Sequence, residues 1–247
     1  MVGHPCVGGV ATQCWRFSGN NAKFSLATNN DESLLTSGAL WFGSHYLAHY
    51  IANSTANLDL TNKVILELGT GTGFLGIALA AMDKGVSKII FTDLESQLVT
   101  VTENIELNRE LFIRNNVQVA VIPYSFGQSA DDFYGALKSK GLDWSVDVIV
   151  GADIAYDVSL HDPLYQTLEQ FLRHPRNPAE LAIIAEEMRW KDIYNWYFEL
   201  VTGNNLRLKL HEQVAEEFST KFFIESNDSD GETATATKSK IFVTVLE

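Results

Sequence analysis

The sequence contains little of what marks a secreted or membrane-spanning protein. Its 247 residues include two cysteines, Cys6 and Cys14, too few for a disulfide framework. The longest purely apolar stretch near its glycines, residues 74–82, is much shorter than the roughly 20 residues that a membrane-spanning helix needs. The first residues lack the charged and apolar regions of a secretory signal. These absences predict a soluble cytoplasmic protein, with the nucleus as a second location, and no membrane partner.

Basic residues are also scarce. The chain has 18 Lys and Arg against 31 Asp and Glu, for a formal net charge of −13. Such a chain repels phosphate backbones, and it contains no run of Lys or Arg, so we expect no nucleic-acid partner. The charge suits a basic partner, such as a lysine-bearing protein segment. The alternative interpretation is that the acidic charge only keeps the protein soluble.

The composition is that of a globular protein, 46% hydrophobic and 20% charged, and the length suffices for one well-cored α/β domain. Two globular domains are possible at this length but not required, because no internal repeat or interdomain linker is visible. Aromatic segments at 14–17 and 23–26 flank a Ser-Gly-Asn-Asn turn, which predicts a β-hairpin. We therefore divide the chain into an N-terminal hairpin extension, 1–37, and one α/β domain, 38–247.

From residue 63 short apolar runs alternate with helical patterns. Strands are expected at Val64–Leu68, 88–92, 117–122, 146–150 and 181–185, and helices at 74–82, 95–108, 160–172 and 194–201. This alternation predicts a mostly parallel, Rossmann-like sheet with helices on both faces. Two late alternating segments, 206–210 and 241–245, predict an antiparallel hairpin that completes seven strands. The polar segment 225–238 between them is expected to be a mobile loop.

The segment from Glu67 to Gly76, Glu-Leu-Gly-Thr-Gly-Thr-Gly-Phe-Leu-Gly, is the most informative part of the sequence. Glycines at the end of a strand let the backbone adopt positive φ and approach a ligand closely. The N-terminus of the helix that follows presents N–H groups to anionic ligand atoms. A ligand here would lie beyond the carboxyl ends of the strands, where open α/β sheets bind their ligands.

Two cofactor chemistries use such a turn. Gly71-x-Gly73-x-x-Gly76 matches the dinucleotide fingerprint, with Asp93 at a suitable distance for a ribose hydroxyl. The series Gly69-x-Gly71-x-Gly73, preceded by Glu67, is similar to the first motif of S-adenosylmethionine (SAM)-dependent methyltransferases. A negative Glu67 would repel a pyrophosphate, which favours SAM. A tight turn without any ligand is the structural alternative.

The segment from Gly38 to about residue 189 resembles the eukaryotic seven-β-strand protein-lysine methyltransferases, methyltransferase family 16. The matching motifs are Gly-Ala-Leu-Trp at 38–41, Phe-Thr-Asp-Leu-Glu at 91–95, Asn-Ile-Glu-Leu-Asn at 104–108, the segment 121–127, Asp-Val-Ile-Val-Gly-Ala-Asp-Ile-Ala-Tyr-Asp at 147–157 and Glu-Glu-Met-Arg at 186–189. The resemblance implies the seven-stranded class I methyltransferase sheet and SAM as cofactor. It also implies a monomeric enzyme that methylates the lysine side chain of a protein, such as a translation elongation factor or a chaperone.

The resemblance also assigns roles to individual residues. In the cofactor site, Trp41 lines the pocket, Glu67 lies near the methionine amino group, Asp93 binds the ribose and Phe126 takes the place of the usual adenine-stacking Trp. The remaining cofactor-binding residues are Gly69, Gly71, Gly73 and Ala152. In the acceptor site, Asp153 orients the incoming amine and Tyr156 shapes the channel. The structural alternatives are capping of the helix after the strand 146–150 for Asp153 and core packing for Trp41 and Tyr156.

Besides Phe126, two positions depart from the family pattern. Phe42 stands where an acidic residue or Pro is common, and Glu186 where an aromatic residue is frequent. Arg189 is a candidate for the acceptor mouth or for pairing with a core acid. His45 and His49 have helical spacing but no third ligand accompanies them, so no metal site is predicted.

The expected chemistry is methyl transfer to an amine. A lysine is mostly an ammonium at neutral pH and must lose a proton before attack, and an apolar channel lowers its pKa. Three rival functions remain open at this point. The acceptor could be His, Arg, an N-terminal amine or a small molecule; the protein could be a non-catalytic SAM-fold binding protein; or it could be a nicotinamide-dependent oxidoreductase, which Glu67 disfavours.

Overall fold

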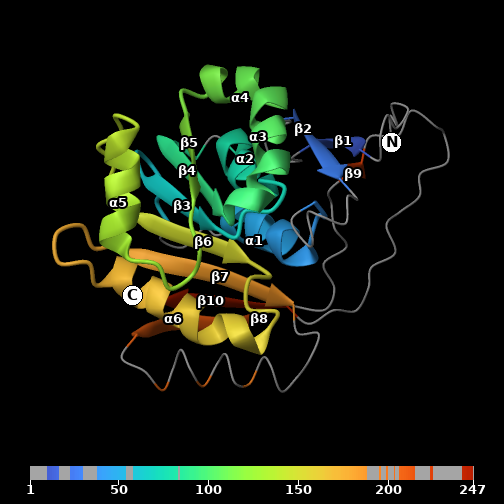
Figure 1. The fold of residues 1–247 in the computed structure, drawn as a ribbon. Coiled ribbons are helices and arrows are strands. Elements are labelled where there is room, and N and C mark those ends of the chain that lie inside the picture. Colours follow the sequence, from blue (N-terminus) through green and yellow to red (C-terminus); the bar gives the residue numbers. More distant parts are fainter. Residues whose placement is uncertain are drawn as a thin grey trace.

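The computed structural model describes residues 10–16, 23–29, 38–53, 58–82, 84–187, 206–214, 223–224 and 241–246, with positions 195, 199 and 203. Its main sheet has seven strands in the order β5-β4-β3-β6-β7-β10-β8 (Figure 1). These are β3 (Val64–Leu68), β4 (Lys88–Asp93), β5 (Gln118–Pro123), β6 (Val148–Ala152), β7 (Leu181–Glu187), β8 (Leu208–Val214) and β10 (Ile241–Leu246).

The sheet is parallel from β5 to β7 and antiparallel at its other end. Strand β3 pairs in parallel with both β4 and β6, and β10 pairs antiparallel with both β7 and β8. The predicted α/β fold, with its parallel sheet and closing hairpin, is confirmed. Because β4 and β6 leave β3 on opposite sides, the strand order reverses there, which is where open sheets place a ligand crevice.

Helices cover both faces of the sheet (Figure 1). The helices are α1 (Phe42–Asn53), α2 (Phe74–Ala81), α3 (Leu98–Leu107), α4 (Arg109–Arg114), α5 (Ala130–Ser139) and α6 (Val158–Leu172). Successive β3 residues serve opposite faces: Ile65 joins the core under α1 to α4, whereas Leu66 joins the core under α5 and α6. This alternation follows from the two-residue period of a strand. The continuous apolar run at 64–68 is therefore buried on both sides.

Several elements differ in extent from the sequence prediction. The expected helix 95–108 is a short 3₁₀ helix, Glu95–Gln97, followed by α3 and then by α4. The expected strand 146–150 begins two residues later, and α5 was not predicted. The predicted helix 194–201 lies mostly outside the described residues, and the predicted loop 225–238 lies wholly outside them.

The predicted hairpin exists and packs against the main domain. Strand β1 (Val10–Arg16) pairs antiparallel with β2 (Lys23–Asn29), and β9 (Phe223–Ile224) pairs with the other side of β1. Trp15 and Phe24 are buried with Phe74 of α2, with ring centroids 5.2 and 5.4 Å from that of Phe74. The hairpin therefore shares the core of the α/β domain.

Two asparagines, one on α3 and one directly after it, hold β2 by its backbone. Asn104 accepts from the Ala27 N–H at 2.6 Å and donates to the Ala27 carbonyl at 2.9 Å. Asn108 makes the same pair of bonds to Ser25, at 2.8 and 2.6 Å. Asn104 also donates to the Thr72 carbonyl in the glycine turn at 2.8 Å. Helical i, i+4 spacing places both amides on one face, where they act as partners for the β2 edge.

We expect Asn104→Ala to lower the free energy of unfolding by about 3 kcal/mol, because it leaves three buried backbone groups without this partner. Asn115→Ala is the matched control, since that amide donates one bond to a backbone carbonyl, that of Ala80 at 2.7 Å, and accepts only a long, exposed one from Arg114 Nε at 3.4 Å. The free energy of unfolding of the control should fall by about 1 kcal/mol. Urea unfolding followed by tryptophan fluorescence measures both. Equal losses in the two variants would contradict the proposed anchoring of β2.

Candidate functional site

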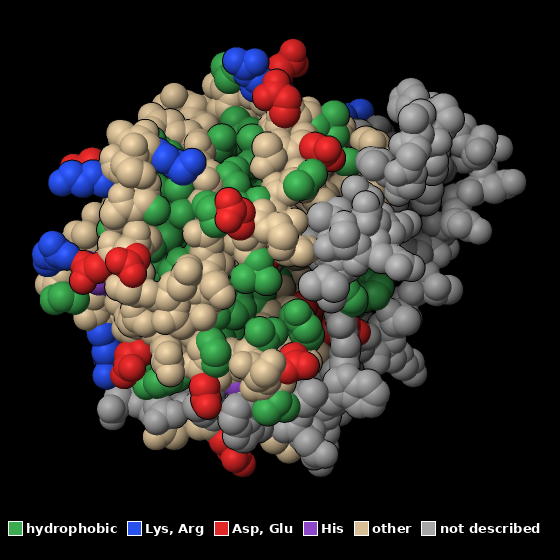
Figure 2. Space-filling model, viewed as in Figure 1, with side chains coloured by type: hydrophobic (Ala, Val, Ile, Leu, Met, Phe, Trp, Pro, Cys, Tyr) green, Lys and Arg blue, Asp and Glu red, His purple; other side chains and the backbone are tan. Residues whose placement is uncertain are grey.

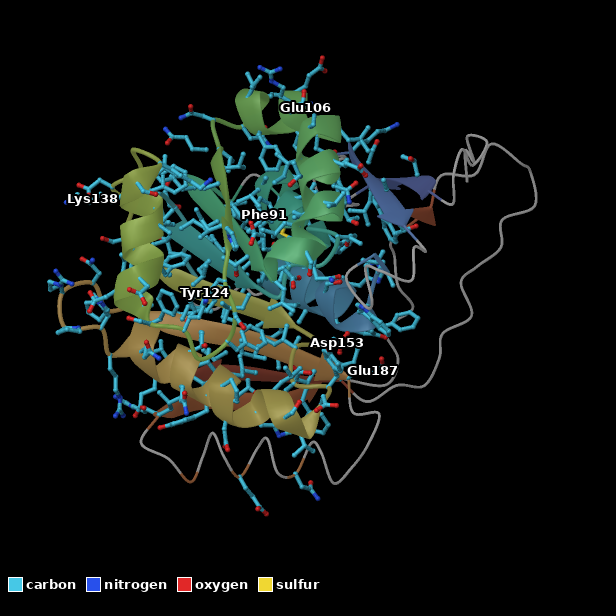
Figure 3. The ribbon with its side chains drawn as sticks, in the orientation of Figure 1. Phe91, Glu106, Tyr124, Lys138, Asp153 and Glu187 are labelled. Atoms are coloured by element: carbon cyan, nitrogen blue, oxygen red, sulfur yellow. The ribbon has the colours of Figure 1, made fainter. Side chains whose placement is uncertain are left out.

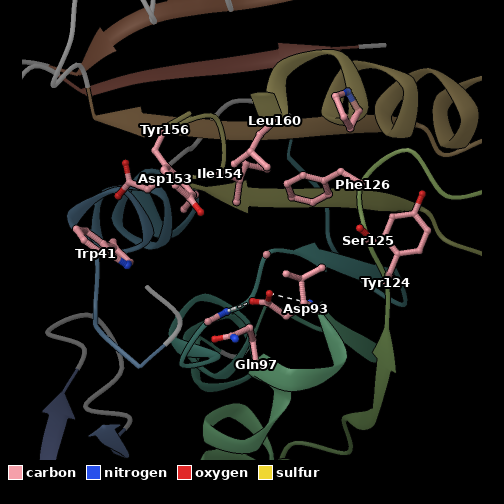
Figure 4. Close-up of a pocket in the computed structure, with 15 residues that line it drawn as sticks. Trp41, Asp93, Gln97, Tyr124, Ser125, Phe126, Asp153, Ile154, Tyr156 and Leu160 are labelled. Carbon is pink, nitrogen blue, oxygen red and sulfur yellow. Dashed lines mark hydrogen bonds between the residues drawn. The ribbon is translucent and has the colours of Figure 1, made fainter. Parts of the chain in front are cut away.

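A cavity of about 260 Å³ opens at the carboxyl ends of β3, β4 and β6. Asp93 and Gln97 lie on one side of it, Trp41, Asp153 and Tyr156 on another, and Phe126 on a third (Figure 4). The lining residues are Trp41, Gly69, Gly71, Asp93, Leu94, Gln97, Tyr124, Ser125, Phe126, Ala152, Asp153, Ile154, Tyr156, Leu160 and Pro163. The cavity thus brings together eight of the ten sequence-predicted site residues. Glu67 and Gly73 do not line it.

The glycine turn forms part of the cavity wall. Gly69 has φ +57°, in the left-handed region that favours glycine. A Cβ added at Gly69 would lie 2.7 Å from Ile154 Cγ2 and 3.6 Å from Phe126 Cζ, both in lining residues. Gly73 caps α2 at φ +78°, and a Cβ there would meet Val101 of α3 at 2.7 Å. The missing side chain at Gly69 therefore leaves the cavity open, whereas the missing side chain at Gly73 allows α3 to pack closely against the turn.

Asp93 ends β4 and is held by the turn. The Gly71 N–H donates to its Oδ2 at 2.9 Å, and the Leu94 N–H donates to its Oδ1 at 2.8 Å. Burial raises the pKa of Asp93, and these two N–H donors oppose that shift. Each carboxylate oxygen has a second lone pair available, so Asp93 can still accept hydroxyl donors from the cavity.

Glu67 lies on β3, beneath the cavity, and its side chain reaches the first turn of α2. Its Oε2 accepts from the Gly76 N–H at 3.0 Å, and a Cβ at position 76 would come within 2.6 Å of that oxygen. Burial raises the pKa of Glu67 to about 8, against the opposing effects of the Thr70 hydroxyl and the Gly76 N–H. At neutral pH Glu67 is therefore mostly protonated. Its contact with a cofactor stays a prediction.

Glu67→Gln should remove a pH dependence of stability. In the folded protein Glu67 keeps its proton up to about pH 8, whereas its ordinary pKa is 4.5. The folded state therefore binds the extra proton in this window, and stability falls as pH rises from 4.5 to about 8. Gln cannot titrate. In this window the free energy of unfolding of the variant should therefore rise relative to that of the wild type by up to about 1.4 kcal/mol per pH unit. Chemical unfolding across this range checks the prediction, and parallel profiles would contradict it.

Asp153 follows β6 and joins three elements. Its Oδ2 accepts from the Gly43 N–H at the start of α1 at 2.7 Å, and its Oδ1 accepts from the Glu187 N–H at the end of β7 at 2.9 Å. A Cβ at position 43 would lie 2.7 Å from Oδ2, so glycine permits this approach. The carboxylate is placed favourably at a helix N-terminus. Asp153 therefore caps α1, the helix that follows Trp41, while it also lines the cavity.

The remaining predicted residues also lie around the cavity. Tyr156 lines the cavity and is 48% exposed, which places it at the mouth instead of in the core. Trp41 precedes α1 and Ala152 ends β6, and both line the cavity. Phe126 lies in the segment after β5, close to Gly69.

Seven lining residues were not among the predicted site residues: Leu94, Gln97, Tyr124, Ser125, Ile154, Leu160 and Pro163. Gln97 is buried and lies within the 3₁₀ turn that follows Asp93, and the sequence alone does not reveal that burial. Tyr124 donates from its hydroxyl to the Gln128 carbonyl at 2.8 Å, which fixes the segment before Phe126. Leu160 and Pro163 lie on α6, whose helical pattern gave no indication that it would reach the cavity.

In the part of the chain that the structure describes, no cluster of His, Cys, Asp and Glu side chains could hold a metal ion. None of the described helices is both long and apolar enough to cross a membrane. The charged residues that line the cavity, Asp93 and Asp153, are both acidic. The cavity therefore suits a ligand that presents hydroxyl groups and positive charge.

Comparisons with known proteins agree with this chemistry. A family model described as lysine methyltransferase matches residues 20–204. EEF1A lysine methyltransferase 3 of Mus musculus is 27% identical over 79% of this chain and 75% of its own length. Protein-lysine N-methyltransferase EFM3 of Chaetomium thermophilum is 28% identical over 64% of this chain and 44% of its own length. The chain spans less than two thirds of the length of several curated relatives that it matches.

A solved structure supports the fold. A protein described as a methyltransferase complexed with S-adenosylhomocysteine (SAH) superposes with a TM-score of 0.50 at 16% identity. The match covers 92% of this chain and 54% of that one.

Proposed function

The chain belongs to the lysine methyltransferase family, and on this premise we propose that it is a SAM-dependent protein-lysine N-methyltransferase. The observation that carries the proposal is the cavity itself. It has Asp93 on one side, Asp153 with Tyr156 on another and the Phe126 ring on a third, and the glycine turn forms part of its wall. This arrangement offers hydroxyl acceptors and an aromatic face for a nucleoside, beside an acidic, partly aromatic place for an amine.

The residues present fit the cofactor. Asp93 would accept the ribose hydroxyls, and Phe126 would stack on the adenine with a smaller face than Trp. The absence of a Cβ at Gly69 leaves room between Ile154 and Phe126. Trp41, Gly71 and Ala152 would complete the walls, and Glu67 and Gly73 would support the turn from below. When bound, SAM supplies an electrophilic methyl group on a sulfonium.

The residues on the acceptor side would prepare the lysine. Its ammonium must release a proton to solvent before its nitrogen is nucleophilic. Asp153, fixed by two backbone N–H groups, would accept a hydrogen bond from the amine and hold its lone pair toward the cavity. Tyr156 would pack along the lysine stem at the mouth. Holding the nitrogen in one orientation is the main contribution to rate that we assign to these residues.

A protein acceptor is supported by the surroundings of the mouth. Leu94 and Tyr156 both line the cavity and are 47% and 48% exposed, and Phe42 and Val158, next to the lining segments in sequence, are 44% and 49% exposed. On the face in Figure 2, hydrophobic side chains lie across the centre, Lys and Arg lie toward the left and upper margins, and acidic side chains are scattered over the face. Exposed apolar groups around a site are typical of a surface that binds another protein.

We further propose translation elongation factor 1A as the substrate, because the mouse relative is named for that activity. The net charge of −13 supports a protein acceptor over a nucleic acid. With such a substrate the protein would work in the cytoplasm, and in the nucleus as a second location. We propose that it does so as a monomer, with residues 1–37 forming a hairpin extension of the 38–247 domain.

Incubation with methyl-tritiated SAM and elongation factor 1A made in bacteria tests this function. The expected result is label in the elongation factor, lost when excess SAH is added. Label in a different protein of a cell lysate would overturn the choice of substrate and keep the enzyme class. Calorimetric binding of SAH without any transfer would contradict the enzyme assignment and favour a non-catalytic binding protein.

A further inference from the structure

Glu186 lies behind the acceptor side of the cavity, on β7. Its side chain is buried and does not line the cavity. Its Oε1 accepts from two consecutive backbone N–H groups, those of Ile154 and Ala155, both at 3.0 Å. One carboxylate oxygen thus holds the turn between Asp153 and Tyr156.

The same turn is tied to β7 by the backbone as well. The Asp153 N–H donates to the Ala185 carbonyl at 2.8 Å, and the Glu187 N–H donates back to Asp153 Oδ1 at 2.9 Å. Asp153 and Glu187 lie side by side at this end of the sheet (Figure 3). Two consecutive residues of β7 therefore hold the turn. The Glu186 side chain binds its backbone N–H groups, and the Glu187 N–H orients the Asp153 side chain.

A histidine also hydrogen-bonds to the turn. His161 of α6 is buried, and its Nε2 lies 2.8 Å from the Ala155 carbonyl. Because a carbonyl only accepts, Nε2 carries the hydrogen in this bond. Burial lowers the pKa of His161, which favours the neutral ring. Both the N–H and the carbonyl of Ala155 are thus fixed by buried side chains.

The backbone of the turn is in a conformation that needs such support. Asp153 has φ +53°, and the left-handed region costs a residue other than glycine about 1 kcal/mol. Residues in such conformations persist when their surroundings over-determine them. Without Glu186, two N–H groups of the turn would lose a buried acceptor, and the turn could relax toward ordinary dihedral angles.

We propose that Glu186 is a positioning residue, which fixes the turn 153–156 so that Asp153 and Tyr156 face the amine. The proposal rests on the proposed function. Glu186 acts through backbone N–H groups and not on the substrate, so its oxygen matters as an acceptor and its charge does not. Gln offers the same oxygen on a side chain of the same length, whereas Ala offers none. The two substitutions therefore separate positioning from charge.

Backbone hydrogen exchange tests the proposal without any substrate. In Glu186→Ala the amides of Ile154 and Ala155 should exchange at least about tenfold faster, and in Glu186→Gln within about threefold of the wild type. Ile183→Val, a buried change on the same strand, is the control, because it lowers stability without touching the turn. Unchanged exchange in Glu186→Ala, or equal acceleration in the control, would overturn the proposal.

Methyl transfer gives the second readout. With elongation factor 1A as acceptor, Glu186→Ala should lower kcat by about 10- to 100-fold, as expected for a misplaced reacting group. The KM for SAM should change little, and Glu186→Gln should restore kcat. Full activity of Glu186→Ala, or a Gln variant as slow as Ala, would overturn the proposal. If the wild type itself transfers no methyl group, the proposed function fails, and the exchange experiment still decides the role of Glu186.

Discussion

Asp153→Asn is expected to stay folded, to bind SAH with nearly the affinity of the wild type, and to transfer methyl groups at least about 100-fold more slowly. Asn tolerates the left-handed φ of +53° at this position. Its single oxygen can keep one of the two N–H donors, from Gly43 and Glu187, at a cost of about 1–3 kcal/mol of stability. What Asn cannot do is hold an amine with a carboxylate. Single-turnover transfer and calorimetry with SAH measure the two properties separately.

Asp153→Ala is a less informative variant, because Asp153 also caps α1. Losing both oxygens removes the cap of α1, and with it the support of Trp41, so cofactor affinity should fall together with activity. An Asn variant with wild-type kcat would contradict the assignment of Asp153 to the acceptor. An Asn variant that loses SAH affinity as strongly as kcat would indicate that the cap alone explains its importance.

Gly69→Ala should abolish most cofactor binding and leave the fold intact. The new Cβ would lie 2.7 Å from Ile154 Cγ2 and 3.6 Å from Phe126, so it would fill the cavity where the turn approaches both side chains. We expect the Kd for SAH to rise about 100-fold, a loss of about 2.7 kcal/mol. The change is read by calorimetry or by quenching of tryptophan fluorescence.

Gly141→Ala is the matched control for this prediction. Gly141 also has positive φ, +77°, but nothing lies within 4 Å of the Cβ that it would gain. Both variants should lose about 1 kcal/mol of stability from backbone strain, and Gly69→Ala should lose more because of its contact with Ile154. Only Gly69→Ala should lose SAH affinity. Equal SAH affinity in the two variants would show that the cavity described here is not the cofactor site.

The sequence predicted the fold because its strongest signals are local. The apolar run at 64–68 followed by glycines, and the later alternating segments, are strand signals, and the structure has strands at these positions. Helix α5 was missed although Ala130, Phe133 and Leu137 have helical spacing and are buried, because Gly135 interrupts a short pattern. The role of Asn104 and Asn108 depends on β2, about 80 residues away, and no local signal reveals such a partner.

The site was predicted less completely than the fold. The turn and Asp93 follow strands and could be placed from sequence alone. From sequence alone Glu67 is a negative charge that repels pyrophosphate, yet burial in the fold raises its pKa to about 8 and the side chain lies below the cavity. Glu186 looked like the loss of an aromatic residue, whereas its contacts with Ile154 and Ala155 arise from the pairing of β6 with β7. Such roles depend on neighbours that only the folded chain brings together.

The identity of the labelled amino acid tests the central claim most directly. Elongation factor 1A labelled by this protein with methyl-tritiated SAM is hydrolysed completely, and its amino acids are separated against standards. The account predicts that the label migrates with methylated lysine and that it disappears with the Asp153→Asn enzyme. Label in methylhistidine, in methylarginine or in an N-terminal amine would contradict the assignment of the cavity to lysine.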